Sequence, residues 1–315
     1  MAIDPRHLRT YLEVCRGNSI SEAARRLNIS QPSVSVAIAQ LEHAVGARLF
    51  ERGRGGIQLT PTGTALRRRA EALENLLAVA QKEARLIEAG VAGPLVIGGT
   101  PGALASLIPK AVALFKAEWP RFDLEVLERP DRTLVELLRG EQIDLALVTT
   151  GAEAIADDMV EEAILRDPFA LIVGRENAGL PARISLRDVS DCPWVLPQAQ
   201  GAFRRQVDAL FVAADTPTPA NLIRCDSLLT TKAIVGDTDY ITILPRQVVA
   251  AELSIGSLRA IEIADADFIR SVGVRRLTGR QLSLTANAFL SALKRAHGVE
   301  DPALDRPAAE NSIHA

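Results

Sequence analysis

The 315-residue sequence lacks an apolar run that could cross a membrane. Its longest weakly polar stretch, residues 95–115, contains one lysine, two prolines and three glycines. The opening residues, MAIDPRHLRTYLEVC, lack the basic, apolar and small-residue succession of a secretion signal. Three cysteines, Cys15, Cys192 and Cys225, are too few and too scattered for a disulfide framework. From these absences we expect a cytoplasmic protein with no membrane partner.

Residue types that carry metal or catalytic chemistry are also scarce. There are four histidines, and no Cys/His cluster has metal-ligand spacing, so we expect no metal site and no cofactor. Ser185 and Ser227 stand apart from any nucleophile-elbow or triad pattern, so we expect no catalytic residues.

Lysine is missing from the first sixty residues, which hold eight arginines and five acidic residues, a net charge of +3. Residues 61–90 carry +1, and the other 225 residues carry −7. A basic front on an acidic body suits a nucleic-acid-binding head. A charge of +3 over sixty residues also arises by chance, so charge alone decides nothing.

The same sixty residues have the spacing of a helix-turn-helix. Leu8, Tyr11, Leu12 and Cys15 mark the inner face of a first helix, and Ser-x-x-Glu at 19–22 is a capping box that opens a second. After a break at 28–30, Ser30 caps a third helix and Pro32 occupies its first turn. Two short helices joined by a three-residue turn are typical of a helix-turn-helix. A small helical bundle with a merely polar outer face is the alternative.

The third helix has an uncharged outer face that suits a DNA major groove. Val34, Ile38 and Leu41 predict its buried side, which leaves Gln31, Ser33, Val36, Ala37 and Gln40 turned outward. Such short side chains let the helix approach base edges. Its amides and hydroxyls can hydrogen-bond to bases or phosphates, while its apolar groups meet thymine methyls.

Residues 49–60, LFERGRGGIQLT, predict a small hairpin with a glycine-rich tip at 53–56. Arg52 and Arg54 lie at or beside the tip, where guanidinium groups bind phosphate. Either arginine alone reads as a solvated surface residue, but together with the helix pair they indicate a wing.

The stretch SISEAARRLNISQPSVSVAIAQLEHAVGARLFERGRGGIQLTPTG resembles the winged helix-turn-helix of LysR-type transcriptional regulators. The resemblance is dense over residues 3–65, in A-A-x-x-L, S-Q-P-S-V-S, the Leu41-Glu42 pair, Gly46, L-F-E-R and L-T-P-T-G. It implies DNA binding by Gln31, Pro32, Ser33, Val36, Ala37, Gln40, Arg52 and Arg54. Family members often carry Arg or Lys after the second serine, where this chain has Val36, Ala37 and Ala39.

Thr60 caps and Pro61 starts a fourth helix that can run to about Ala89. Its apolar residues recur at spacings of four and three, which is a heptad seam that contains Leu66, Leu73, Leu77 and Ile87. We expect this linker helix to pair with a second copy of the chain, and the resemblance implies the same. An amphipathic helix lying on its own domain is the alternative.

From residue 95 strand-like and helical runs alternate, which predicts an α/β body with largely parallel sheets. The domain boundaries we expect are 1–60 for the winged head, 61–90 for the linker and 91–297 for the body, followed by a disordered tail at 298–315. In the body, lobe one covers about 95–165 and 268–297, and lobe two about 166–267. This is the layout of periplasmic-binding-protein-like domains, which the LysR family shares.

Ligands of open α/β sheets bind at the carboxyl ends of strands, beside helix N-termini. The corners at 98–102, 149–151 and 198–203 therefore predict a cleft for a small, carboxylate-bearing effector. Its expected residues are Gly99, Thr100, Thr149, Gln200, Gly201 and Phe203. A glycine beside a strand end often serves only to form a turn, which is the alternative for each corner. The resemblance to the LysR family supports the prediction of a ligand site at all three.

The leading interpretation is a ligand-responsive regulator. Its partners are double-stranded DNA, further copies of the chain in a homodimer or homotetramer, a small-molecule effector of unknown identity, and RNA polymerase as a further candidate. The first alternative is a redox-responsive regulator that uses Cys192 and Cys225. A solute-binding protein or an enzyme is more remote, because a solute-binding protein would lack residues 1–90 and carry an export signal.

Overall fold

The computed structural model describes residues 2–299 apart from 54–55, 153, 199–200 and 266–267. The chain forms two compact units. The first contains Met1–Ala89 together with Glu136–Gln142, and the second contains Gly90–Val135 and the described chain from Ile143 onward. Among the described residues, no helix is both long enough and apolar enough to cross a membrane.

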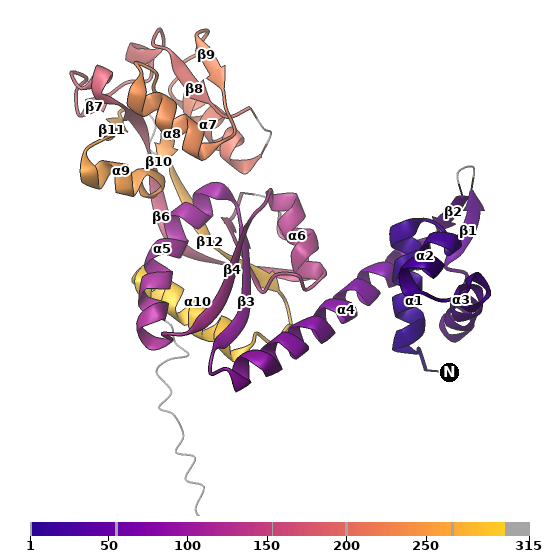
Figure 1. The fold of residues 1–315 in the computed structure, drawn as a ribbon. Coiled ribbons are helices and arrows are strands. Elements are labelled where there is room, and N and C mark those ends of the chain that lie inside the picture. Colours follow the sequence, from indigo (N-terminus) through magenta and orange to yellow (C-terminus); the bar gives the residue numbers. More distant parts are fainter. Residues whose placement is uncertain (1, 54–55, 153, 199–200, 266–267, 300–315) are drawn as a thin grey trace, which may run out of the picture. The chain divides into compact units, whose positions relative to one another are not determined.

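The first unit is a winged helix-turn-helix followed by a long helix (Figure 1). Its elements are α1 (Pro5–Gly17), α2 (Ile20–Leu27), α3 (Gln31–Val45), β1 (Phe50–Gly53), β2 (Gly56–Leu59) and α4 (Pro61–Glu88). The three predicted caps are present, since Ser19, Ser30 and Thr60 each accept a backbone N–H of their own helix. The core of this unit includes Tyr11, Leu12, Val34 and Leu41.

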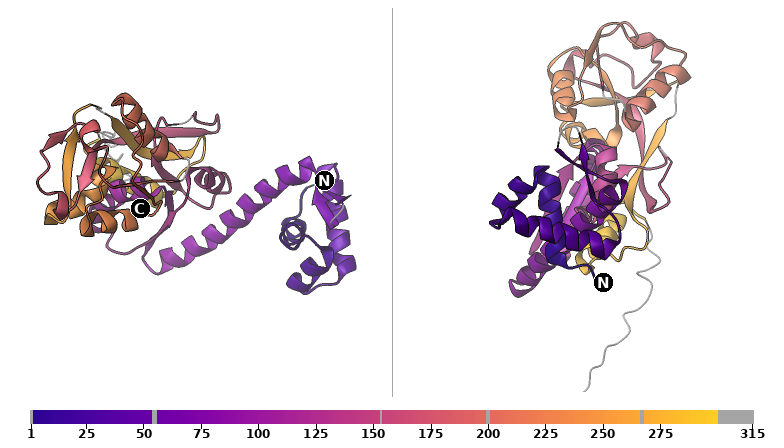
Figure 2. Two further views of the ribbon diagram at one scale, coloured as in Figure 1. Left: turned by 90° about the horizontal axis from the view of Figure 1, so that it is seen from above. Right: turned by 90° about the vertical axis from the view of Figure 1, so that its right-hand side faces the viewer.

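Helix α4 divides into a packed first part and an exposed second part. It is one unbroken helix of 28 residues (Figure 2, left). Leu66 and Ala70 pack against the core of the winged head, and Ala70 is only 3 % exposed. Leu73, Leu77 and Ile87 are 36 %, 54 % and 68 % exposed. The first part of the predicted seam is therefore used within the head, and the part available to a partner begins at Leu73.

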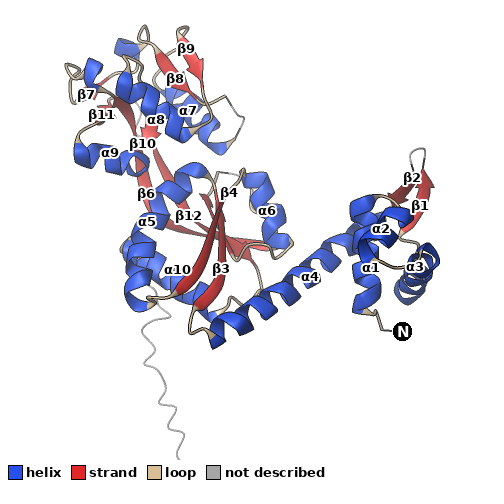
Figure 3. Cartoon of the chain, viewed as in Figure 1, coloured by secondary structure: helices blue, strands red, loops and turns tan. Residues whose placement is uncertain are grey.

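The second unit alternates helices and strands as the sequence predicts (Figure 3). Its helices are α5 (Pro101–Glu118), α7 (Ala202–Ala213), α8 (Leu228–Asp237), α9 (Ala250–Ile255) and α10 (Leu284–Ala296), together with the first half of α6 (Asp131–Arg139), whose residues from Glu136 onward are grouped with the first unit. Its strands are β3 (Ala92–Gly99), β4 (Phe122–Glu128), β5 (Leu145–Thr149), β6 (Met159–Val173), β7 (Arg183–Ile184), β8 (Trp194–Leu196), β9 (Leu222–Arg224), β10 (Thr242–Pro245), β11 (Arg259–Ile263) and β12 (Ile269–Leu277). Three short 3-10 turns lie at Arg175–Asn177, Arg187–Val189 and Arg246–Val249.

The main sheet is mixed, so the expectation of largely parallel sheets is wrong. Its order is β4-β3-β5-β12-β6-β11-β7, with β10 also paired to β6. Strand β3 is parallel to β4 and β5, but β12 and β6 are antiparallel to each other. Strand β12 is also antiparallel to β5, and β6 to β10 and β11. These antiparallel pairs all involve β6 or β12, the two strands along which the chain passes between the lobes. Both strands join the same sheet and run in opposite directions.

Separate hydrophobic cores divide the unit into two lobes, with one core in lobe one and two in lobe two. The core of lobe one contains Ile97 of β3 and the buried faces of α5 and α10, where Phe115 packs edge-on against Phe289. One core of lobe two surrounds Trp194 and Phe211. Strands β6 and β12 run between the lobes (Figure 1). Val299 packs against lobe one, and residues 300–315 of the predicted tail lie outside the described residues.

Candidate functional site

The turn between α2 and α3 is fixed by local hydrogen bonds. Asn28 ends α2 in the left-handed conformation, with φ of 55°, and its N–H donates to the last carbonyls of that helix. The Ile29 N–H donates to the Ala24 carbonyl at 3.0 Å. The Ser30 hydroxyl then accepts the Ser33 N–H at 3.2 Å and begins α3. These bonds set the angle between the two helices, which a recognition helix needs in order to enter a groove.

Helix α3 presents a nearly uncharged face to solvent. Val34 and Leu41 are fully buried and Ile38 is 9 % exposed, as predicted. Gln31, Pro32, Ser33, Val36 and Gln40 are exposed. The structure therefore places these five predicted contact residues where a DNA groove can reach them. The Ser33 and Ser30 hydroxyls lie 2.8 Å apart and share one hydrogen bond, which leaves further acceptor capacity on both oxygens.

The prediction that Ala37 faces outward is wrong. Ala37 is only 9 % exposed, because it lies three residues after Val34 and four before Leu41, on the inner side of the helix. Ser35 and Ala39 are exposed instead. The hydrophobic periodicity misplaced Ala37 because alanine is small enough to occur on either the buried or the exposed face of a helix.

The wing is a short antiparallel hairpin of β1 and β2. Phe50 pairs with Leu59, and Gly53 pairs with Gly56 at the tip. Arg52 lies in β1 opposite Ile57, as the pattern predicts, while Arg54 lies outside the described residues.

Two residues that sequence reasoning quoted only as motif letters hold the wing in place. The Glu42 carboxylate, near the end of α3, accepts the Leu49 N–H at 2.7 Å and the Phe50 N–H at 3.4 Å. Gly63 comes so close to the chain that a Cβ there would lie 2.2 Å from the Leu49 carbonyl oxygen. The Tyr11 hydroxyl donates to the Gly63 carbonyl at 2.7 Å, and burial raises the pKa of Tyr11. Helix and wing are therefore joined to one core.

In lobe one, three predicted effector residues lie at neighbouring strand ends. Gly99 ends β3 and pairs with Leu147 of β5, and Thr149 ends β5. Thr100 is the N-cap of α5, and its N–H donates to the Leu147 carbonyl at 3.0 Å. Its side chain makes no capping hydrogen bond, which sets it apart from the caps Ser30 and Thr60. The hydroxyl is thus available beside a helix N-terminus, where anions are favoured.

The three effector residues predicted in lobe two differ in what the structure shows of them. Gly201 is the N-cap of α7, and Gln200 lies outside the described residues. The Phe203 ring stacks on Phe169 at a centroid distance of 6.1 Å and packs against both lobe-two cores. Packing therefore explains much of the position of Phe203, which we predicted to cover an apolar ligand.

Sequence reasoning missed a buried ion pair beside the start of α5. Arg270 is 3 % exposed and Asp167 is fully buried, and Arg270 Nη2 lies 3.1 Å from Asp167 Oδ2. The same nitrogen donates to the Gly102 carbonyl at 3.1 Å and the Ser106 hydroxyl at 3.0 Å. Asp167 Oδ1 accepts the Gln247 N–H at 3.0 Å. Burial lowers the pKa of Arg270, and the Asp167 carboxylate opposes that shift. The pair fixes the first turns of α5.

The serines and cysteines that we considered for catalysis or redox sensing make ordinary structural contacts. Ser185 Oγ donates to the Asp265 carboxylate, and Ser227 caps α8. Cys192 and Cys225 are half-buried free thiols against different core clusters. Burial, with Asp191 and Asp239 nearby, raises the pKa of Cys192, which lowers the thiolate fraction that redox chemistry requires. Within the described residues, no group of three or more His, Cys, Asp or Glu is arranged to hold a metal ion.

Two family descriptions match successive parts of the chain. Residues 5–64 match "Bacterial regulatory helix-turn-helix protein, lysR family", and residues 88–298 match "LysR substrate binding domain". The second match covers more than half of the chain. The chain therefore belongs to the LysR family of DNA-binding transcriptional regulators with an effector-binding domain, and it is not an enzyme.

Individual relatives agree with this assignment. The HTH-type transcriptional regulator PcaQ of Agrobacterium fabrum is 27 % identical over 294 residues, which cover 93 % of this chain and 94 % of PcaQ. The HTH-type transcriptional regulator GalR of Pseudomonas putida is 24 % identical over 290 residues, which cover 92 % of this chain and 73 % of GalR.

Solved structures share the fold. Full-length CbnR complexed with its target DNA has a TM-score of 0.66 and 20 % identity, and covers 93 % of this chain and 99 % of that one. A full-length OxyR variant from Pseudomonas aeruginosa has a TM-score of 0.65 and 20 % identity, with 94 % and 95 % coverage.

Proposed function

We propose that this regulator binds its operator as a dimer and that a small carboxylate-bearing effector changes this binding. The observation that carries the effector is the Thr100 hydroxyl, which is not used as a helix cap although it lies at the N-terminus of α5. A carboxylate there meets backbone N–H groups and the positive end of the helix dipole. Gly201 and Phe203 would approach the ligand from lobe two, so that occupancy favours one lobe separation.

Dimerisation is supported by the exposed part of α4. Leu73 and Leu77 border an apolar groove of about 230 Å³ that α1 and α4 form within the first unit. Leu8, Leu12 and Ala70 also line this groove. Leucines that recur at heptad spacing and remain exposed need a partner, and the α4 helix of a second copy supplies the same pattern. Assembly of two dimers into a tetramer is the further state that we propose.

DNA recognition would then be divided between two elements. Gln31, Ser33, Val36 and Gln40 of α3 would read base edges, and Arg52 and Arg54 of the wing would bind phosphates. RNA polymerase is the further partner that transcriptional activation would require. A cytoplasmic location would give the protein access to both DNA and RNA polymerase.

A ligand screen tests the effector proposal. The full chain is melted with a panel of small carboxylic acids and with the matching primary amides. Binding to the native state raises Tm with concentration, so acids should stabilise the chain where their amides do not. Equal stabilisation by acid and amide would show that the ligand is not recognised through its charge. Stabilising acids are then titrated into a complex of the chain with genomic DNA fragments that it selects.

The redox alternative predicts a different result. If Cys192 and Cys225 were the sensor, peroxide would change DNA binding and the change would require both thiols. Thiol titration before and after peroxide separates the two mechanisms, because a carboxylate-responsive regulator retains all of its free thiols.

A further inference from the structure

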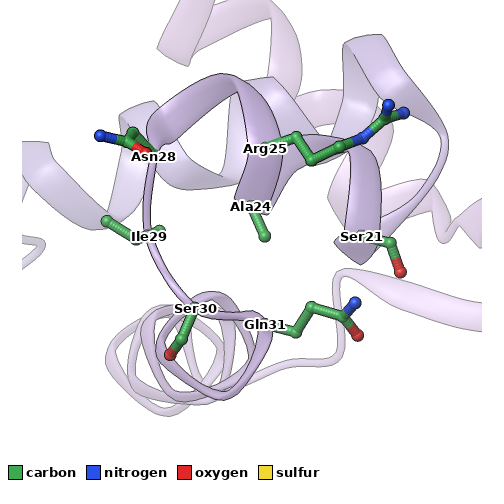
Figure 4. Close-up of a pocket in the computed structure, with 7 residues that line it drawn as sticks. All are labelled: Ser21, Ala24, Arg25, Asn28, Ile29, Ser30 and Gln31. Atoms are coloured by element: carbon green, nitrogen blue, oxygen red, sulfur yellow. The ribbon is translucent and has the colours of Figure 1, made fainter.

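A polar pocket lies between α2 and the start of α3 (Figure 4). Its volume is about 420 Å³, and it is lined by Ser21, Ala24, Arg25, Asn28, Ile29, Ser30 and Gln31. Ala24 is 5 % exposed and occupies the space between the two helices. The Gln31 side chain extends toward the side on which Ser21 lies. Residues of α2, the turn and the start of α3 therefore surround one hollow, and the exposed Arg25 side chain, whose guanidinium points away from α3, starts at its rim.

We propose that this pocket binds one backbone phosphate of the duplex, through Arg25 and Ser21. The inference rests on the DNA-binding function of this head. In a helix-turn-helix the first helix crosses the DNA backbone while the second enters the major groove. A pocket between these two helices lies where the strand bordering that groove must pass. Arginine and serine side chains are common phosphate ligands at such contacts.

The charge distribution explains why Arg25 is needed. Helix α3 contains no lysine or arginine, and its one basic residue, His43, lies in its last turn, away from the N-terminal turns that would enter the groove. Arg25 lines the same pocket as Gln31 of this helix, and its side chain is 79 % exposed. A guanidinium there supplies the counter-charge that the recognition helix lacks, and its planar donors suit a phosphate.

Arg25 is free to change partners at little cost. It is paired with Glu22 on its own helix, and its guanidinium side chain is largely solvated, so exchanging the carboxylate for a phosphate loses little. The neighbouring Arg26 differs, because it is 47 % exposed and contacts both Glu22 at 3.1 Å and Glu13 at 3.8 Å. Arg26 does not line the pocket. After the exchange, Arg26 still neutralises Glu22.

This difference supplies a matched pair of variants. Arg25→Gln and Arg26→Gln each remove one charge and one contact to Glu22, but only the first alters the pocket. Fluorescence anisotropy with a labelled random-sequence duplex, over a series of KCl concentrations, gives the salt dependence of binding for the full chain. We expect Arg25→Gln to flatten the slope by about one unit, since one phosphate contact releases about one counterion. Arg26→Gln should leave the slope near that of the wild type.

A second measurement locates the phosphate. In a genomic fragment selected by the wild-type chain, single phosphates are replaced in turn by neutral methylphosphonates. One position in each half-site should weaken wild-type binding but weaken Arg25→Gln no further, because the contact is already lost. Ser21→Ala should lower affinity about tenfold through the loss of a hydrogen bond to a charged group, with an unchanged salt slope.

Two results would overturn the proposal. Equal slopes for Arg25→Gln and Arg26→Gln, or additive losses at every methylphosphonate position, would show that Arg25 contacts no phosphate. Wild-type binding would remain intact in both cases, so the failure would concern this pocket alone. A wild-type chain with no salt-dependent affinity for any duplex would contradict both this proposal and the proposed mode of DNA recognition.

Discussion

Arg270 Nη2 lies 3.1 Å from Asp167 Oδ2, and the two residues come from the two strands that cross between the lobes. Arg270 reaches Gly102 and Ser106 at the start of α5 in lobe one, while Asp167 accepts the N–H of Gln247 in the turn after β10. Gly102 has no room for a side chain, because a Cβ there would lie 2.8 Å from Arg270 Nη1. The crossing is therefore a fixed junction around one buried charge pair.

Removing one charge from this junction should destabilise the second unit strongly. Asp167→Asn keeps the shape but leaves the Arg270 guanidinium buried without a counter-charge, at a cost of roughly 3–5 kcal/mol. Urea denaturation followed by tryptophan fluorescence measures the loss. Asp215→Asn is the matched control, since Asp215 also accepts from an arginine but its side chain is 97 % exposed. If both variants unfolded at the same urea concentration, the buried pair would have no special role.

The exposed part of α4 should hold the dimer. Leu73→Asp places a charge in the proposed seam, where burying it unpaired costs several kcal/mol. Sedimentation should show monomers, and the binding of two half-sites should be lost with the dimer. Ala78→Asp adds the same charge to an exposed position outside the seam and should remain dimeric. A Leu73→Asp chain that still sediments as a dimer would show that the seam serves only the head.

The wing and the recognition helix should fail in different ways. Arg52→Ala or Arg54→Ala should lower affinity for all sequences and flatten the salt slope by about one unit per lost phosphate contact.

Changes in the recognition helix should alter sequence preference instead. Gln31→Ala or Ser33→Ala should change the ranking among operator variants. Ser33→Ala keeps the cap of α3, because Ser30 Oγ bonds to the Ser33 backbone N–H and not only to its hydroxyl. Binding competitions among operator variants, with melting curves for each protein, test both expectations. Variants that altered stability alone would contradict this division of roles.

The head could be predicted in detail because its signals are local. Caps at Ser19, Ser30 and Thr60 and the spacing of Val34, Ile38 and Leu41 act within a few residues of one another. Ala37 was misplaced for the reason that limits such patterns, since a methyl group fits either side of a helix.

The crossing strands were predicted only in part, again for a physical reason. Strand β12 and the first half of β6 contain charged residues that pair across the sheet, such as Arg275 with Glu161. Charged residues interrupt the apolar pattern by which a strand is predicted, so that pattern indicates surface positions here. The burial of Arg270 depends on Asp167, which is 103 positions away in the chain, and no local periodicity reports such a partner. The positions of Thr100 and Thr149 at strand ends were predicted because each lies at the end of an apolar run, while their role in effector binding stays a prediction.

The effector site should depend on one hydroxyl. Thr100→Val keeps the shape of the α5 N-cap and removes a hydrogen bond of about 1 kcal/mol or somewhat more, so about tenfold more effector should be needed for a response. Because the Thr100 side chain makes no capping bond, the melting temperature should stay near that of the wild type. Ser283→Ala is the control, since it removes a real cap of α10, at 3.1 Å from the Ala286 N–H, and should lower stability without changing the response.

Effector titration of operator binding, for the wild-type chain and for Thr100→Val, tests the account most directly. Binding of the effector and binding of DNA are thermodynamically linked. If the effector changes the affinity for DNA by some factor, then DNA must change the affinity for the effector by the same factor. We predict a reciprocal shift in the wild type, the same shift in Thr100→Val with its midpoint about tenfold higher, and unchanged operator binding without effector. Identical midpoints for the two proteins, with a lower melting temperature for Thr100→Val, would show that Thr100 serves only its helix and that the ligand binds elsewhere.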